Sequence, residues 1–405
     1  MAIGIGGSTA DLELAKLSDM TTGVAQISLK EFYARIETAQ AIMQKQGIEA
    51  VYLNAGTNLY YFTGMKWNVG ERMVGAILPA QGAVQFIAPA FEQDTINEFM
   101  VVPGTLHCWH EHESPALLCA QILQQLNVTS GKVAIDESTA FFMFNNLRHA
   151  APQFEYIDAK AVTAGCRQIK SNAEIALLQR AKDMTLEVHK AASRILHIGI
   201  CTTEVEAFIH QAHKAVGAPK GSYFCIVLFG KASSFPHGVK DAQYLQQDDV
   251  VLIDTGCQVH GYNSDITRTY VFGEASAEVR AAWASEKKSQ QAAFDAAQIG
   301  IACQEVDAAA RVALVEDGYG PDYELPGLPH RTGHGIGLDI HEWPYLVGGD
   351  HTPLATGMCF SNEPMLVIQG KFGIRLEDHF YMTDRGPKWF TQPSHSIDDP
   401  FGYKA

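Results

Sequence analysis

The sequence predicts a two-domain protein in which an α/β unit is followed by an α+β unit. Three observations support this fold class. The chain has 405 residues, more than one domain usually contains. Helix and strand patterns alternate in its first part, whereas apolar runs typical of antiparallel strands close its second part. We expect an N-terminal arm over residues 1–27, a first domain over 28–165 and a second domain over 166–405.

The first domain is expected to open with a helix at Ser28. The preceding arm is rich in Gly, Ser and Thr and is expected to be loosely ordered. Ser28 and Glu31 form a capping box, apolar residues then repeat at helical spacing, and Gly47 ends the pattern. The later elements are expected as β-rich runs at 50–53, 73–78 and 83–88, the last two joined by a turn at 79–82, a helix near 115–127, a strand at 133–136 and a helix near 138–149.

The second domain is expected to begin with two capped helices. Ser171 and Glu174 form one capping box, and Thr203 and Glu206 form another, whose helix stops at Gly217. The later elements are expected as strands at 222–229, 250–254 and 266–272, helices near 275–298 and 303–317, and antiparallel strands at 358–367, 373–377 and 379–383.

Composition and charge exclude several classes of protein. A net charge of −15 would repel phosphate backbones, so we expect no nucleic-acid partner. No apolar run of about 18 residues occurs, so we expect no membrane span. The eight cysteines are scattered without a Cys-x-x-Cys pair, which argues against a disulfide framework and against a zinc finger. Because the amino terminus also lacks a basic segment followed by an apolar one, we expect a cytoplasmic protein.

Two aspartates border neighbouring apolar strands in the second domain. Asp254 ends the run 250–253, and Asp265 opens the next strand after Gly256 and Gly261. A hairpin through these glycines would bring the two carboxylates together, and adjacent carboxylates repel unless they share a proton or a cation. Two solvent-facing turn aspartates are an equally weighted alternative for this segment alone.

Three more segments place acids or a histidine beside apolar strands. Glycines flank His334, Glu363 precedes a proline, and Glu377 lies two residues after Arg375. Each alone has an ordinary explanation, such as a core histidine or a surface salt bridge. Four acids gathered in one pocket, however, would be very costly without cations.

The set therefore predicts a metal centre. Oxygen-rich ligation with one imidazole favours Mn(II), with Co(II), Fe(II) or Zn(II) as alternatives. Five ligands exceed what one ion needs, so we expect two ions about 3.5–4 Å apart. The five predicted metal ligands are Asp254, Asp265, His334, Glu363 and Glu377.

The order and surroundings of these residues resemble the pita-bread metallopeptidases, in the branch that holds prolidase and Xaa-Pro aminopeptidase. The resemblance covers residues 236–378 and is specific, because all five ligands are in register. The motifs that carry it are Pro236-His237-Gly238, Asp-x-Gly through Asp-Ile-Thr-Arg-Thr at 254–269, Gly-His-Gly through His-Glu-x-Pro at 333–344, Glu363-Pro364, and Arg-x-Glu-Asp at 375–378.

The resemblance implies a fold and an activity. The first domain would be the creatinase-like α/β domain, and the second the pita-bread domain, with helices outside a curved antiparallel sheet. The activity would be hydrolysis of Xaa-Pro bonds, most readily in dipeptides, by a homodimer that binds two divalent metal ions per subunit. A metal-activated bridging hydroxide would attack the peptide carbonyl.

The resemblance also implies roles for individual residues. Asp254 would chelate one ion, His334 and Glu363 the other, while Asp265 and Glu377 would bridge both. Glu363 would also carry a proton to the leaving proline nitrogen. The remaining implied roles are substrate binding and oxyanion stabilisation by His237 and His341, and orientation of Glu377 or of a substrate carboxylate by Arg375.

One departure from the family leaves the substrate length open. Prolidases commonly carry an arginine in the loop after His-Glu-x-Pro, where it binds the carboxylate of a dipeptide, and residues 345–356 contain none. His351 would replace it only in part, because it is mostly neutral at pH 7. We favour a dipeptidase, with a Xaa-Pro aminopeptidase or a non-peptide hydrolase or lyase, acting on an organophosphate or on dimethylsulfoniopropionate, as alternatives.

Two further features are weighed against plainer explanations. Tyr223, Phe224, Trp343 and Tyr345 are candidate walls for a proline ring, although any of them is more often plain core. The segment with His107, His110 and His112 favours a surface segment, or a loop that reaches a partner subunit's pocket, over a second metal site.

Overall fold

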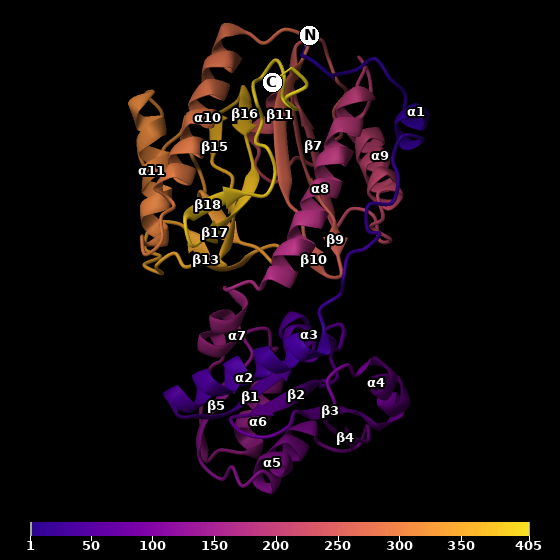
Figure 1. Ribbon diagram of the computed structural model, residues 1–405, viewed down its shortest axis with the longest axis vertical. Coiled ribbons are helices and arrows are strands. Elements are labelled where there is room, and N and C mark those ends of the chain that lie inside the picture. The colour runs from indigo at the N-terminus through magenta and orange to yellow at the C-terminus, as the bar shows by residue number, and fades with distance from the viewer. Residues whose placement is uncertain (1, 405) are drawn as a thin grey trace. The chain divides into compact units, whose positions relative to one another are not determined.

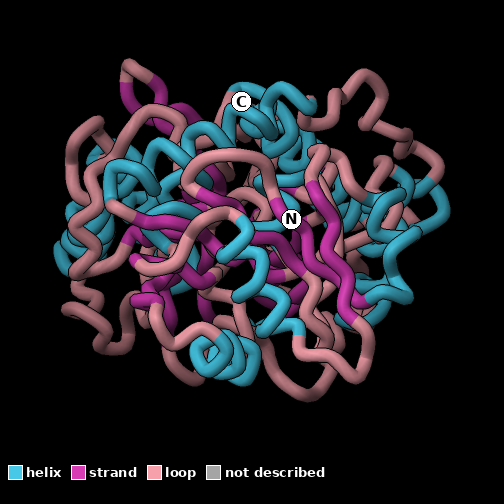
Figure 2. Tube along the Cα trace, turned by 90° about the horizontal axis from the view of Figure 1, so that it is seen from below, coloured by secondary structure: helices cyan, strands magenta, loops and turns pink. Residues whose placement is uncertain are grey.

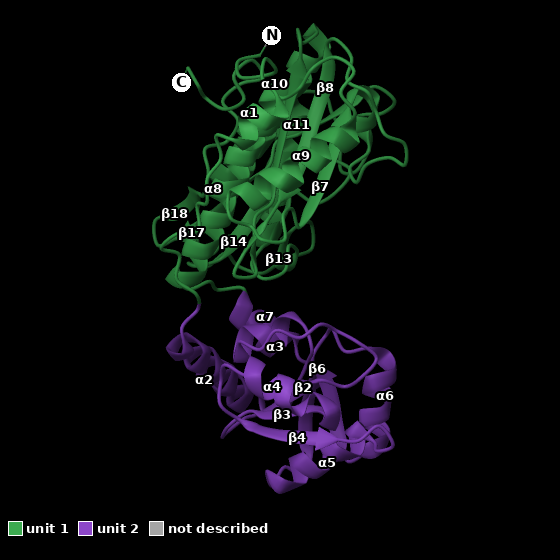
Figure 3. Cartoon of the chain, turned by 90° about the vertical axis from the view of Figure 1, so that its right-hand side faces the viewer, with its two compact units in different colours: residues 1–26, 168–405 green, residues 27–167 purple. Residues whose placement is uncertain are grey.

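The computed structural model describes residues 2–404 and divides the chain into two compact units (Figure 3). The first unit comprises residues 27–167, and the second unit combines residues 1–26 with 168–405. Residues 2–26 therefore pack with the second unit and are not the loosely ordered arm suggested by their composition. Helix α1 (Ala10–Leu14) contains Glu13, which is fully buried and paired with Lys16 and Arg194 at 2.6 Å each. The sequence could not indicate a partner about 180 residues away.

The first unit is built on a six-stranded mixed sheet in the order β4-β3-β2-β1-β5-β6. Strand β1 (Ile48–Asn54) pairs antiparallel with β2 (Gly75–Pro79) and parallel with β5 (Gly131–Ile135). The predicted hairpin joins β2 to β3 (Gln85–Pro89). The edge strands are β4 (Thr105–Trp109) and β6 (Phe154–Asp158), which the sequence patterns did not predict.

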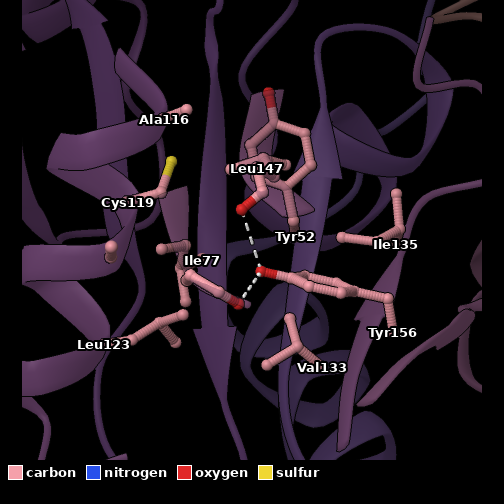
Figure 4. Close-up of a pocket in the computed structure, with 11 residues that line it drawn as sticks. Tyr52, Ile77, Ala116, Cys119, Leu123, Val133, Ile135, Leu147 and Tyr156 are labelled. Carbon is pink, nitrogen blue, oxygen red and sulfur yellow. Dashed lines mark hydrogen bonds between the residues drawn. The ribbon is translucent and has the colours of Figure 1, made fainter. Parts of the chain in front are cut away.

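Helices complete the first unit and enclose its apolar core. The helix predicted at Ser28 is α2, and the Ser28 side chain accepts a hydrogen bond from the Glu31 amide. A cavity of about 20 Å³ lies in the core beside Tyr156, whose hydroxyl donates to the carbonyls of Leu147 and Ala151 (Figure 4). The helices of this unit are α2 (Leu29–Gln46), α3 (Thr57–Thr63), η1 (Ala90–Glu92), α4 (Gln93–Phe99), α5 (Pro115–Gln125), α6 (Phe141–Ala150) and α7 (Lys160–Arg167).

The second unit contains antiparallel strands. One sheet has the order β11-β8-β7, another the order β13-β12-β14-β17-β18, and two short pairs, β9-β10 and β15-β16, accompany them. The strands are β7 (Phe224–Phe229), β8 (Asp249–Gly256), β9 (Gln258–Val259), β10 (Tyr262–Asn263), β11 (Ile266–Phe272), β12 (Gly333–Gly335), β13 (Glu342–Leu346), β14 (Cys359–Asn362), β15 (Met365–Ile368), β16 (Phe372–Arg375), β17 (Asp378–Thr383) and β18 (Gly386–Trp389).

Four long helices cover these strands. In Figure 1, α10 (Ala277–Ala296) and α11 (Cys303–Glu316) lie on one side of the strands, and α8 (Asn172–Arg194) and α9 (Thr202–Ala215) on the other. Figure 2 traces these helices in cyan and the strands in magenta. A short 3₁₀ turn, η2 (Gly230–Ser234), follows β7. No helix in residues 2–404 is long and apolar enough to cross a membrane.

The helix caps agree with the sequence in one case and correct it in the other. The Ser171–Glu174 capping box opens α8 as predicted. The box predicted at Thr203 and Glu206 is wrong, because α9 is capped by Cys201 with Glu204. The Glu204 carboxylate accepts from the Cys201 amide at 2.9 Å, and the Thr203 hydroxyl donates to the Cys201 thiol. A sulfur cap falls outside the Ser, Thr, Asp and Asn preference on which the prediction rested.

Candidate metal centre

A hairpin of two buried strands positions the two aspartates. Strands β8 and β11 pair antiparallel, with Asp254 opposite Thr267 and Thr255 opposite Ile266. Asp265 immediately precedes β11, so it lies beside Asp254, as the spacing of the glycines predicts. Both aspartates are buried, with 7% and 6% of their surface exposed. The alternative of two solvent-facing turn residues is therefore wrong.

The five-stranded sheet brings together the remaining three predicted ligands. His334 is the central residue of β12, which pairs with β14. Glu363 follows the last residue of β14, and Glu377 precedes the first residue of β17. Because those two terminal residues, Asn362 and Asp378, are partners across the sheet, the two glutamates leave it at the same end.

An isolated β-bridge and side-chain contacts join this group to the aspartate hairpin. Thr267 of β11 and Glu377 form an isolated antiparallel bridge, in which the Glu377 amide donates to the Thr267 carbonyl at 3.2 Å. The Thr267 hydroxyl donates to Glu377 Oε2 at 2.6 Å and accepts from Arg375 Nε at 3.0 Å. Arg375 in turn pairs with Asp254 through its Nη2. All five predicted ligands therefore lie in one connected group.

Distances between ligand atoms are short enough for shared cations. His334 Nε2 lies 2.9 Å from Glu363 Oε1 and 3.7 Å from Asp265 Oδ2. Ligand atoms of Asp265, His334 and Glu377 all lie within 4.8 Å of one another. The His334 Nδ1 atom donates to the Gly335 carbonyl at 3.0 Å, which directs Nε2 toward the acids.

The electrostatics of the acids favour a positive charge beside them. Burial and then the charges of neighbouring acids raise the pKa of Asp265 and of Glu377 well above their ordinary values. Burial likewise raises the pKa of Asp254, although Arg375 opposes this. Among residues 2–404, Asp254 Oδ1 and Glu377 Oε1 are buried without a hydrogen-bond partner. Oxygen atoms in this state are suited to coordinating a divalent cation.

Glu363 differs from the other acids. Burial raises its pKa, but the charges and hydrogen bond of His334 and the charges of His330 and Arg375 outweigh burial and hold the pKa below its ordinary value. The Ser361 hydroxyl donates to Glu363 Oε1 at 3.1 Å and also accepts from the His334 amide at 2.9 Å. Glu363 is therefore an ionised carboxylate fixed against His334.

The predicted substrate-side residues lie at the border of this group. The His341 ring contacts the His334 ring edge to face, with centroids 4.3 Å apart, and desolvation together with nearby positive charges lowers the pKa of His341 to about 4. His237 is exposed and follows Pro236, whose carbonyl accepts from Arg375 Nη1 at 3.1 Å. Arg375 itself is 3% exposed, and its donors are directed at protein groups.

The structure adds residues that sequence patterns did not single out. Thr267 links the two sheets, as described. The Lys182 ammonium is fully buried on α8, where burial lowers its pKa to about 8 while the charges of Cys359, Asp265 and Glu377 oppose this. His330 and Arg331 precede the glycine-flanked His334. The charges of Glu363 and Arg375 act on the pKa of His330, and the charge of Arg331 acts on the pKa of His341. Of these residues, His330 and Arg331 could have been noticed in the sequence, because they directly precede the Gly-His-Gly motif.

The histidine segment of the first unit does not form a second centre. The His107 ring nitrogen lies 3.0 Å from the Gln85 side-chain oxygen, and His110 stacks on His112 with centroids 5.9 Å apart. Both His110 and His112 are exposed. Within the described part of the chain, these three histidines do not converge on a common point.

Comparison with known proteins identifies the same architecture. The model of metallopeptidase family M24 matches residues 176–384, and that of the creatinase/prolidase N-terminal domain matches residues 35–169. The Xaa-Pro dipeptidase of Pyrococcus furiosus is 29% identical over 363 residues, which cover 90% of this chain and 99% of that protein.

Solved structures match over the same extent. The dipeptidase PepE of Mycobacterium ulcerans has a TM-score of 0.84 and 30% identity, covering 92% of this chain and 98% of that one. The prolidase of Thermococcus sibiricus has a TM-score of 0.80 and 30% identity, covering 91% and 98%. The predicted fold class, a creatinase-like α/β domain followed by a pita-bread domain with an antiparallel sheet, is therefore confirmed.

Proposed function

The chain belongs to metallopeptidase family M24, and on this premise we propose that it is a dinuclear metal-dependent dipeptidase that hydrolyses Xaa-Pro bonds. One observation carries the proposal: five donor side chains from separate segments, four of them carboxylates, meet in a buried group with unpartnered oxygens. The Xaa-Pro dipeptidases and prolidases among its relatives support the choice of substrate.

The number of donors supports two metal ions. Four carboxylates and one imidazole meet in this buried group, and Arg375 contacts one of the carboxylates. Five donor side chains exceed what one ion needs, so two ions fit the set better. We propose that Asp254 holds one ion, that His334 and Glu363 hold the other, and that Asp265 and Glu377 bridge both. Mn(II) is the proposed ion, with Co(II), Fe(II) or Zn(II) as alternatives.

The ions would supply Lewis acidity and activate water. The chain's own residues would transfer the proton, bind the substrate carbonyl and position the ligands. Glu363 is the most accessible of the four carboxylates of the group, with 15% of its side chain exposed, and as an ionised carboxylate it would accept a proton from water and pass it to the leaving nitrogen. His341 is neutral at pH 7 and would donate a hydrogen bond to the substrate carbonyl, with His237 beside it. Arg375 is buried against Asp254, so we assign it a positioning role.

Selectivity for proline requires recognition without an amide hydrogen, because the prolyl nitrogen has none. An apolar or aromatic wall can bind the ring instead. Tyr345 lies opposite His334 across β12 and β13, and Trp343 contacts Tyr345 with ring centroids 4.5 Å apart. Of the four candidate wall residues, we therefore favour these two over Tyr223 and Phe224.

The proposal is tested by removing and restoring the metal. Chelator-treated protein should be inactive, and Mn(II) should restore cleavage of Xaa-Pro dipeptides but not of matched dipeptides such as Ala-Ala. Cleavage confined to longer Xaa-Pro peptides would favour the aminopeptidase alternative. Metal-loaded protein that ignores every Xaa-Pro peptide would overturn the proposal. The cytoplasmic location and the homodimer expected from the sequence stay predictions.

A further inference from the structure

Arg331 presents an unpaired guanidinium beside the metal centre. Its guanidinium carbon lies 4.3 Å from the centroid of the Tyr345 ring, and the residue is half-buried. No carboxylate within residues 2–404 forms an ion pair with it. By contrast, Arg268 and Arg375 nearby each pair with a buried aspartate. A half-buried cation held in place without an anion is suited to binding an anion from outside.

The register of the sheet places this guanidinium on the same side as the metal ligands. Tyr345 is the direct antiparallel partner of His334, and directly opposed residues project from the same face of a sheet with their Cβ atoms about 5 Å apart. Arg331 also acts on the pKa of His341, whose ring contacts His334. The guanidinium therefore lies within side-chain reach of the point where the scissile bond must sit.

A dipeptide brings an anion to that position. In Xaa-Pro the free α-carboxylate belongs to the residue directly after the cleaved bond, within about 4 Å of it. The other arginine of the site, Arg375, is already committed to Asp254, Thr267 and the Pro236 carbonyl. Of these two arginines, Arg331 is the one whose donors are available for a substrate carboxylate.

Building on the proposed function, we propose that Arg331, stacked on Tyr345, binds the free α-carboxylate of the substrate and thereby selects dipeptides over longer peptides. Stacking on the ring fixes the guanidinium before substrate arrives, which lowers the entropy lost on binding. A longer peptide has an amide in place of the carboxylate and continues into the space that Arg331 and Tyr345 fill. The cation thus replaces the arginine that the loop after Pro344 lacks.

The test compares Ala-Pro with its C-terminal amide, Ala-Pro-NH₂, in which a neutral amide of nearly the same size replaces the charged carboxylate. With Mn(II)-loaded protein, Arg331→Met should raise KM for Ala-Pro roughly 10- to 100-fold while changing kcat only a few-fold, the signature of lost uniform binding. The amide should be a poor substrate for both proteins, with a similar kcat/KM. Arg331→Lys should retain part of the affinity. In isothermal titration calorimetry, L-proline should bind wild type but not Arg331→Met, which measures carboxylate binding without hydrolysis.

Lys388→Met is the matched control, because Lys388 is an exposed cation over the ring of Tyr381, at 5.7 Å. It should leave both substrates unaffected. The inference is overturned if wild type cleaves the amide as well as the dipeptide, if Arg331→Met leaves Ala-Pro kinetics unchanged, or if it lowers cleavage of both equally at unaltered metal content. Failure of the proposed function looks different, since wild type itself would then cleave no Xaa-Pro peptide.

Discussion

Removal of the Thr267 hydroxyl should weaken metal binding. The hydroxyl is fully buried and bonds two charged groups at once, donating to Glu377 Oε2 and accepting from Arg375 Nε. Thr267→Val keeps the shape of the side chain and removes both bonds. The change leaves Glu377 with neither oxygen bonded to a described side chain, because its Oε1 has no partner already.

The expected effects follow from those two bonds. A hydrogen bond to a charged group contributes about 1.5–3 kcal/mol, so after partial relaxation the free energy of unfolding should fall by about 3 kcal/mol. Loss of a hydrogen bond that orients a ligand typically lowers metal affinity 10- to 100-fold. Urea denaturation measures the first quantity, and competition with a fluorescent chelator for Mn(II) measures the second.

Thr269→Val separates the two effects. Thr269 lies two residues along the same strand, is equally buried, and also makes two bonds, but both go to the backbone of Arg375. This variant should lose stability, by about 1–3 kcal/mol, with Mn(II) affinity within about twofold of wild type. Equal loss of affinity in both variants, or unchanged affinity in Thr267→Val, would refute the assignment of Thr267 as a residue that orients a metal ligand.

Three further predictions concern other buried charges. Asp265→Asn should lower the metal content from two ions per chain, because a bridging oxygen is lost, and elemental analysis that still finds two would contradict the bridging role. Lys170→Met should cost about 3–5 kcal/mol of unfolding free energy in urea, since it leaves Glu342, its 2.9 Å partner, charged and buried; an unchanged midpoint would show that this pair is not needed. For Lys182, the unfolded chain keeps the ammonium up to its ordinary pKa of 10.5, while burial lowers the folded pKa to about 8, so the unfolded state binds more protons between these values. Wild type should therefore gain up to about 3 kcal/mol relative to Lys182→Met as the pH rises from 8 to 10.5, and parallel pH profiles would exclude the shift.

Sequence patterns predicted the elements that carry strong local signals. The capped helices at Ser28 and Ser171 and the hairpin that joins Asp254 to Asp265 all formed where expected. Strands β4 and β6 were missed for a physical reason. They are the two edges of their sheet and are half-exposed, so their residues show neither a continuous apolar run nor a clean alternation.

The site was predicted only where its residues have a recognisable neighbourhood. Acids and a histidine beside glycines at strand ends could be selected from the chain. The supporting contacts could not, because each joins segments far apart in sequence. Thr267 and Glu377 are 110 residues apart, and Lys182 lies on a helix whose spacing is that of any amphipathic helix. Arg331 appears in the sequence next to His334, but its position over Tyr345 depends on the pairing of β12 with β13.

The candidate metal ligands are divided between two sheets of the second unit. Asp254 and Asp265 belong to the three-stranded sheet, whereas His334, Glu363 and Glu377 belong to strands and strand ends of the five-stranded sheet. The bridge between Thr267 and Glu377, the contacts of Arg375 and the ion pair of Arg268 with Asp378 tie these edges together directly. Cations bound by both sets of ligands would act as a cross-link between the two sheets, so the free energy of metal binding would also stabilise the fold. The same acids that make the metal-free centre costly thus make metal binding and the integrity of this domain interdependent.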